Sequence, residues 1–297
     1  MRRWSRWRAF AVALVLLGTP VAGQAERAGD IWAGASAGFA VQWSRSDIAV
    51  HRGKQLVFSA SDWAKAGLAH FLMVNRSAGG TAPPDCDYQR HMRIVALVGT
   101  MMSLEDRLEI SCRREAHPGG MTRLITVDLA ASGPLAQAGR DAIGRIDTRH
   151  PGQAVLLTKL FPATDVLAAL ASTPQLREVL QRTGANPRAL PELLAAVGGA
   201  SGQGDDCFIV PDDLLGSFAF DRVDQDRIVL RLGLPGDGPC RMNLTTATSR
   251  FAMPDALAAA VRRAASGEAG FLADRGEAIA LGRRTEILLR TGRGGER

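Results

Sequence analysis

The chain has 297 residues, of which 46% are hydrophobic, 22% are charged and 5% are aromatic. This ordinary globular composition excludes a disordered chain, a collagen-like chain and a membrane protein with several spans. The formal net charge of +6 does not indicate nucleic-acid binding, because four arginines fall within the first eight residues and no acidic residue precedes Glu26. Removal of residues 1–23, with their four arginines, would leave a net charge of +2.

Residues 1–23 have the three parts of a secretory signal peptide. A basic start ends at Arg8, an apolar run extends from Ala9 to Leu17, and small residues follow up to Gly23. Cleavage is expected after Gly23 or after Ala25. The apolar run is shorter than the roughly 20 residues of a membrane-spanning helix, and an uncleaved anchor is the alternative. The sequence therefore predicts an exported protein, periplasmic or secreted.

The rest of the chain predicts a single α+β domain over 37–270, between a linker at 24–36 and an arginine-rich C-terminal tail at 271–297 that frays. Antiparallel hairpins form the sheet and a helical segment packs on it. In chain order, strands are expected at Phe39–Trp43, Ile48–His51, Gln55–Ser59, Leu104–Cys112, Met121–Leu129, Leu215–Phe220 and Arg227–Leu234. Helices are expected at Ser61–His70, at 164–183 with a second helix starting at Pro174, at Pro191–Val197 and at Pro254–Ala265.

Four cysteines in an exported protein predict two disulfides. Cys86 and Cys112 lie equally far from a predicted turn at Gly99, and the midpoint of Cys207 and Cys240 falls within a second polar turn, Val223-Asp-Gln-Asp226. A hairpin at each turn would place the two partners opposite each other. We therefore expect bridges between Cys86 and Cys112 and between Cys207 and Cys240.

The first cysteine pair permits a second interpretation. Cys86 with His91 and Cys112 with His117 form two C-x4-H units, which together could supply four zinc ligands. Tetrahedral zinc sites more often use other spacings, and exported thiols oxidise. The disulfide is therefore favoured, and no metal or other cofactor is expected.

Two residues are candidates for hydrolytic chemistry. Ser36 lies in Gly34-Ala-Ser-Ala-Gly38, which matches the G-x-S-x-G motif of a nucleophile elbow, but that motif needs a buried strand before the serine and a helix after it. The sequence favours a linker or a strand edge there. His117 would need a nucleophile and an orienting acid within hydrogen-bond reach, and the proline and glycines that follow it favour a turn. A periplasmic hydrolase that uses Ser36 or His117 is the alternative function.

Between residues 45 and 260 several motifs follow one another: Met102-Ser-Leu-Glu-Asp106, Glu115-Ala-His-Pro-Gly-Gly120, Val127-Asp-Leu129, Leu156-Leu-Thr-Lys-Leu-Phe161 and Asp206-Cys-Phe-Ile-Val-Pro-Asp-Asp-Leu-Leu215. This order resembles the extracellular domain of RsiV-type anti-sigma factors, which recurs as the C-terminal part of PdaC-type peptidoglycan deacetylases. The sequence departs from that family by reading Glu-Ala-His where the family favours Gly-Ala-His. Neither a cytoplasmic sigma-binding part nor the motifs of a deacetylase domain are found.

The resemblance implies a non-catalytic binding domain of the bacterial cell envelope rather than an enzyme. Its expected partner is a lysozyme-type muramidase or peptidoglycan, and nucleic acid is not expected. Exposed loops on a rigid scaffold commonly carry recognition. The candidate contact residues are therefore those of one loop: Glu115, His117, Pro118, Gly119 and Gly120.

Overall fold

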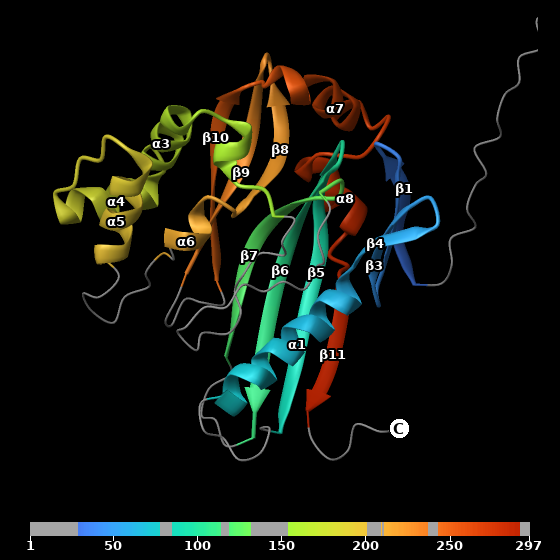
Figure 1. Cartoon of the computed structure of the whole chain (residues 1–297). Helices are drawn as coiled ribbons and strands as arrows, with labels where there is room; N and C mark the ends of the chain where they lie inside the picture. Colours follow the sequence, from blue (N-terminus) through green and yellow to red (C-terminus); the bar gives the residue numbers. More distant parts are fainter. Residues whose placement is uncertain are drawn as a thin grey trace, which may run out of the picture.

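The computed structural model describes residues 29–77, 85–113, 119–131, 154–200, 209, 211–236 and 243–291. Three antiparallel sheets organise the described chain (Figure 1). We call them the N-terminal sheet, with strand order β1-β2-β3-β4, the long sheet, with order β11-β5-β6-β7, and the short sheet, with order β10-β9-β8. Helices pack on these sheets, so the predicted α+β class is confirmed.

The strands and helices have the following bounds. The strands are β1 Asp30–Ser36, β2 Phe39–Ser44, β3 Ile48–Arg52, β4 Gln55–Ser59, β5 Cys86–Val98, β6 Met101–Cys112, β7 Gly119–Asp128, β8 Phe218–Asp224, β9 Arg227–Pro235, β10 Leu244–Ala252 and β11 Thr285–Thr291. The helices are α1 Ala60–Ser77, α2 Leu157–Leu160, α3 Ala163–Ala171, α4 Pro174–Thr183, α5 Leu190–Ala200, α6 Pro211–Leu214, α7 Asp255–Ser266 and α8 Ala273–Ala280. Within the described part of the chain, no helix combines the length and apolar character needed to cross a bilayer.

The N-terminal sheet starts earlier than the sequence suggested. Strand β1 pairs with β2 through a two-residue turn at Ala37 and Gly38, which have φ angles of 49° and 83°. Positive φ at both central positions is the geometry of a type I′ hairpin turn. Ile31 is buried in the core. The expected linker at 24–36 is therefore wrong for residues 30–36, because this segment contributes a buried apolar side chain and pairs with β2 as a strand.

The hairpin of β5 and β6 turns at Gly99 as predicted, with Val98 opposite Met101. Gly99 has a φ of 60°, which suits the first position of a two-residue hairpin turn. A register shift between Ile94 and Ala96 then inserts one extra residue into β5. Without this bulge the register set at the turn would place Cys112 opposite Asp87. The bulge therefore brings Cys86 and Cys112 into direct opposition.

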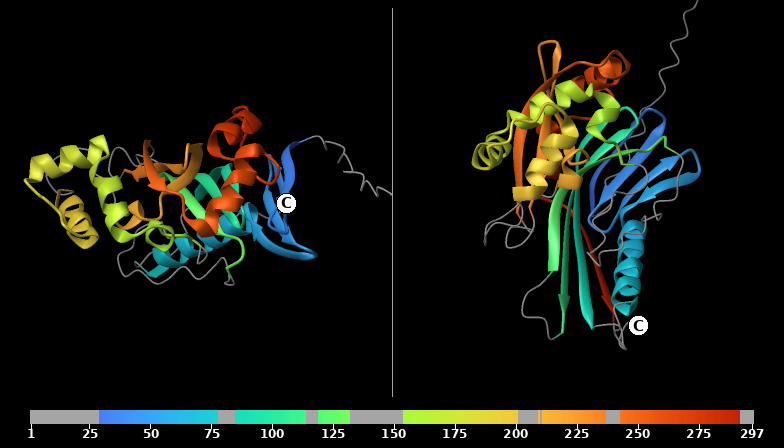
Figure 2. Two further views of the ribbon diagram at one scale, coloured as in Figure 1. Left: turned by 90° about the horizontal axis from the view of Figure 1, so that it is seen from above. Right: turned by 60° about the vertical axis from the view of Figure 1, so that its left-hand side comes forward.

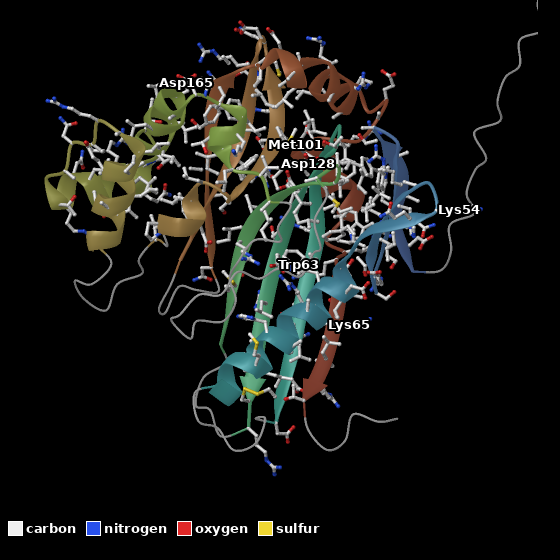
Figure 3. The ribbon with its side chains drawn as sticks, in the orientation of Figure 1. Lys54, Trp63, Lys65, Met101, Asp128 and Asp165 are labelled. Atoms are coloured by element: carbon white, nitrogen blue, oxygen red, sulfur yellow. A yellow bond between two sulfur atoms is a disulfide. The ribbon has the colours of Figure 1, made fainter. Side chains whose placement is uncertain are left out.

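Two apolar cores lie on different parts of the long sheet. One core fills the space between a face of the long sheet, helix α1 and the N-terminal sheet, and includes Trp43, Phe58 and Leu104. The second core surrounds the tip of the β5–β6 hairpin and joins it to the short sheet and to helices α3, α5 and α7. Figure 2 shows α1 along one face of the long sheet, with the α3–α5 helices set apart beside the short sheet. In Figure 3, Trp63 extends from α1 over the strands of the long sheet.

The C-terminal segment belongs to the fold. Phe271 and Leu97 exchange two backbone hydrogen bonds of 2.9 and 2.8 Å, and β11 pairs with β5 from Thr285 opposite Met92 to Thr291 opposite Cys86. The expectation of a frayed tail at 271–297 is therefore wrong for residues 271–291. Its many arginines suggested a solvated segment, but alternate residues such as Ile287 are buried against the long sheet.

Most other elements agree with the sequence, with shifted ends. Helix α4 begins at Pro174 as expected, whereas α1 continues past His70 to Ser77. The second hairpin turns at Gln225 and Asp226, within the predicted turn. Cys207 and Cys240 lie outside the described residues, so the second disulfide remains a prediction. Between them in sequence, Ile209 and Gly236 form an antiparallel bridge.

Candidate functional site

The Cys86–Cys112 disulfide closes one end of the long sheet, as predicted. The backbone N–H of Cys86 also donates to Oγ1 of Thr291 over 2.9 Å, so β11 is fixed at the same end. The zinc interpretation is wrong, because both sulfurs are used in the bridge. Cys86 and His91 are five positions apart in a regular stretch of strand, an odd offset that places their side chains on opposite faces of β5.

The predicted recognition loop divides into two parts. Glu115, His117 and Pro118 lie outside the described residues. Gly119 and Gly120 are the first residues of β7, where they pair with Ile110 and Glu109, and Gly120 is buried. These two glycines are therefore sheet residues rather than loop residues. The sequence predicts the start of this strand at Met121. The observed pairing begins two residues earlier, since glycine has the backbone N–H and C=O groups that form the hydrogen bonds between strands.

Ser36 does not occupy a nucleophile elbow. It is the last residue of β1, opposite Phe39, and only 3% of its surface is exposed. The chain that follows it turns back as an antiparallel strand, whereas the elbow needs a helix at this point. The G-x-S-x-G pattern is here a tight hairpin turn that uses Gly38 for its positive φ.

A buried cluster of charged residues lies between α1 and the long sheet. Arg90 on β5 donates to both carboxylate oxygens of Asp106 on β6, over 2.6 and 2.7 Å, and Arg123 on β7 donates over 3.2 Å. The exposed fractions of Arg90, Asp106 and Arg123 are 3%, 0% and 1%. The guanidinium carbon of Arg90 lies 3.9 Å from the ring centre of Trp63, a cation–π contact from α1.

The electrostatics of this cluster favour its charged form. Burial alone would raise the pKa of Asp106, but the charges and hydrogen bonds of Arg90 and Arg123 lower it below its ordinary value. Burial raises the pKa of Tyr88, whose hydroxyl accepts a long hydrogen bond from Arg90. Nη1 of Arg123 has no hydrogen-bond partner within the part of the chain that the structure describes. Since all three charged groups are sealed from solvent, we interpret the cluster as a structural element rather than as a reactive site.

Sequence reasoning missed this cluster, although one signal was present. Leu104, Leu108, Ile110 and Cys112 were expected to share the buried face of one strand, and they do. Asp106 lies two positions from Leu104 and from Leu108, so its side chain points to the same face of the strand. A carboxylate at a buried position demands a buried cation, and this was the available clue.

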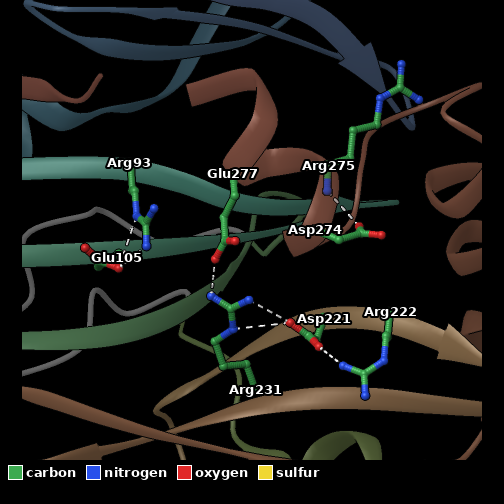
Figure 4. Close-up of polar contacts among 8 residues, drawn as sticks. All are labelled: Arg93, Glu105, Asp221, Arg222, Arg231, Asp274, Arg275 and Glu277. Atoms are coloured by element: carbon green, nitrogen blue, oxygen red, sulfur yellow. Dashed lines mark hydrogen bonds and ion pairs between the residues drawn. The ribbon is translucent and has the colours of Figure 1, made fainter. Parts of the chain in front are cut away.

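The opposite face of the long sheet holds a polar groove of about 240 Å³ near the end of α8. We call it the arginine groove. Figure 4 shows one of its ion pairs, between Arg93 and Glu105, together with Glu277 of α8. Four arginines and one histidine line the groove, against a single glutamate. The lining residues are His91, Met92, Arg93, Glu105, Arg107, Gly282, Arg283 and Arg284.

The strand register places the polar groups of the groove in rows. His91 on β5 lies opposite Glu286 on β11 and opposite Arg107 on β6, while Arg93 lies opposite Glu105. Nδ1 of His91 is 3.7 Å from Oε1 of Glu286 and has no hydrogen-bond partner among the described residues. Burial lowers the pKa of His91, although the charge of Glu286 opposes this effect. The neutral form of the imidazole is therefore favoured.

A third set of charges connects α8 to the short sheet. Arg231 on β9 donates to Glu277 on α8 over 2.6 Å and to Asp221 on β8 over 2.8 Å (Figure 4). Asp221 also accepts from Arg222. Because Asp221 is buried and Arg231 bridges two elements, we interpret this network as a clamp that holds α8 in place beside the groove.

The three charged regions differ in what they can do chemically. The buried cluster and the α8 clamp hold elements together, whereas the arginine groove offers cationic donors to solvent. Comparisons with known proteins add no precedent: no family model, no curated protein and no solved structure matches the chain.

Proposed function

We propose that this chain is an exported protein of the bacterial envelope whose domain binds a partner without turning it over. The observation that carries the proposal is the Cys86–Cys112 disulfide at the end of the long sheet. Disulfides persist in oxidising compartments such as the periplasm and the cell exterior. A disulfide therefore fits the signal peptide expected at residues 1–23. Intact mass spectrometry would test the export step, since cleavage predicts the mass of a chain that begins after Gly23 or Ala25.

The disulfide also supports the assignment of the contact region. Cys112 ends β6 before the predicted contact residues Glu115, His117 and Pro118, and Gly119 begins β7 after them. Cys112 is held by the bridge and Gly119 by its pairing with Ile110. Rigid anchor points reduce the conformational entropy that a binding segment loses when a complex forms. This end of the long sheet is thus suited to present a recognition segment.

The class of partner comes from the family resemblance. It favours a lysozyme-type muramidase, bound as an inhibitor or sink, or else peptidoglycan itself. The rival proposal, a periplasmic hydrolase, is weakened for Ser36 by its position at a hairpin turn. His117 remains its other candidate, and a substrate-turnover assay on the same protein samples would separate the two functions.

The deciding experiment is calorimetric titration of the oxidised mature protein with a c-type lysozyme, with muramidase activity followed in parallel. Peptidoglycan fragments form the second arm. Saturable heat with either ligand would support the binding function. Absence of heat with both ligands, or multiple turnover of the fragments, would overturn it.

Loop variants give the residue-level test. Glu115→Lys and His117→Ala should weaken binding, because both change the predicted contact segment. Glu268→Lys is the matched control, since Glu268 is an exposed residue just beyond the end of α7, far along the chain from the loop. Equal loss in Glu115→Lys and Glu268→Lys would show a general charge effect and would refute the assignment of the loop.

A further inference from the structure

The arginine groove has hydrogen-bond donors that its own carboxylates do not use. Arg93 places Nε and Nη2 on one oxygen of Glu105, over 3.1 and 2.6 Å, and Arg107 places Nε on Glu109 over 2.6 Å. A guanidinium carries five N–H donors, so each arginine keeps donors to spare. Arg284 forms no ion pair with any residue in the described ranges.

The groove is also open where a ligand would enter. Gly282 forms part of its wall with a φ of 76°, and a Cβ placed there would meet no atom within 4 Å. The preceding residue, Leu281, has a φ of 46° and is 75% exposed. A left-handed leucine is strained, and its apolar side chain stands in solvent beside a cationic groove. The groove therefore combines a cationic floor with an apolar residue at its rim.

We propose that the arginine groove binds a phosphate group, presented as free phosphate or as the headgroup of an anionic lipid. Guanidinium groups match the geometry of phosphate oxygens and are weakly hydrated, which favours such pairs. Glu105 and Glu109 orient Arg93 and Arg107 without using all of their donors. This inference goes beyond the proposed partner binding and does not rest on it, because Gly119 and Gly120, the described residues of the Glu115–Gly120 segment, do not line the groove.

The pKa of His91 should report whether the arginine groove holds an anion. The charged groups around it are Glu286 on β11, Arg284 before β11, and Glu109 and Arg107 on β6. A bound dianion would favour the imidazolium, so the pKa of His91 should rise by about one unit in saturating phosphate. A merely structural role for the arginines would leave this pKa unchanged.

The test is titration of the full mature protein with inorganic phosphate at constant ionic strength, followed by calorimetry and by the NMR signals of His91. Arg107→Glu should weaken phosphate binding by more than about tenfold, because it replaces a cationic hydrogen-bond donor with a carboxylate that repels the anion. Arg290→Glu is the matched control: Arg290 lies on β11, pairs with Asp87 over 3.1 Å and does not line the groove. Unperturbed His91 signals, or equal weakening in both variants, would overturn the proposal.

A second arm distinguishes the two sources of phosphate. Vesicles of phosphatidylglycerol are compared with vesicles of neutral phosphatidylcholine, with wild type and Leu281→Ser. Groove-dependent binding to phosphatidylglycerol that weakens in Leu281→Ser identifies a lipid headgroup. Binding of inorganic phosphate without vesicle binding identifies free phosphate. Failure of both probes overturns the proposal while leaving the lysozyme and peptidoglycan titrations as an independent test of the proposed function.

Discussion

The two faces of the long sheet carry similar residues in opposite circumstances. Asp106 and Glu105 are neighbours in β6, and each forms a close ion pair with an arginine of β5. Asp106 is fully buried under α1 with Arg90 and Arg123, whereas the side chains of Glu105 and Arg93 are about 30% exposed at the edge of the arginine groove. Strand geometry alone separates them, because successive side chains point to opposite faces.

The comparison shows how solvent decides the role of an ion pair. A buried charge keeps its ionised form only if partners replace the lost hydration, so the buried cluster holds its geometry rigidly. A partly exposed pair gains little from its contact and is screened by salt, so its arginine is available to a further ligand. We therefore expect the buried face to govern stability and the open face to govern binding.

The largest effect is expected from Asp106→Asn. The change leaves two buried guanidinium groups without a counter-charge and should cost about 3 to 5 kcal/mol in the free energy of unfolding. Urea denaturation measures it. Glu105→Gln is the matched control on the other face and should cost at most about 1 kcal/mol. Similar losses in the two variants would break the comparison between the faces.

The same cluster predicts a pH dependence. The pKa of Asp106 is lowered in the folded state, so its ionised form contributes stability that is complete above about pH 4 and is lost as the pH falls below that value. Denaturation curves between about pH 7 and pH 3 should show a steeper loss for wild type than for Asp106→Asn. Parallel curves would indicate that other carboxylates cause the acid sensitivity.

Removal of the disulfide should have the next largest effect. The bridge spans 26 residues. The chain-entropy account gives about 3 to 4 kcal/mol for a loop of this size, mainly through the unfolded state. Cys86→Ala with Cys112→Ala, unfolded in non-reducing buffer, measures the loss. A loss below about 1 kcal/mol would show that the pairing of β11, β5 and β6 closes this end of the sheet by itself.

Gly67→Ala probes the packing of α1 on the buried cluster. A Cβ at Gly67 would overlap the hydroxyl of Tyr88, which is itself buried. We expect a loss of about 1 to 2 kcal/mol, since the clash outweighs the better helix propensity of alanine. Gly199→Ala in α5 is the control, because its Cβ would meet nothing within 4 Å, and it should stabilise the protein slightly. Thermal unfolding of both variants decides this.

The smallest effect concerns the rim of the groove. Leu281 has a positive φ and is mostly exposed, so Leu281→Gly relieves backbone strain while losing little burial. It should raise the free energy of unfolding by about 1 kcal/mol, as measured by urea titration. A decrease instead would mean that the leucine stabilises its neighbours more than the backbone strains them.

The local parts of the fold could be predicted from the sequence because their causes are local. Gly99 marked the hairpin turn, alternation placed Leu104 and Cys112 on one face, and Pro174 marked the start of α4. Parts that depend on distant pairing were missed. Strand β11 pairs with β5 about 200 residues away. The charged residues on its exposed face made the alternation of buried residues along β11 hard to recognise in the sequence.

The candidate sites show the same division. Sequence order located a disulfide and a recognition segment, but it could not show that β7 would take up Gly119 and Gly120. The arginine groove needs three segments, β5, β6 and the connection from α8 to β11. No spacing of residues in the sequence predicts that these three segments lie side by side, because their proximity depends on which strands become neighbours.

By itself, the sequence determined the class of the fold, the hairpins and the cysteine pair of the long sheet, since turn chemistry and strand periodicity are encoded within short segments. Only the tertiary structure decided that Asp106 would be sealed with Arg90 and Arg123, and that Arg93, Arg107 and Arg284 would line a groove. The physical reason is that burial and electrostatics depend on neighbours in space, which sheet pairing across the whole chain selects.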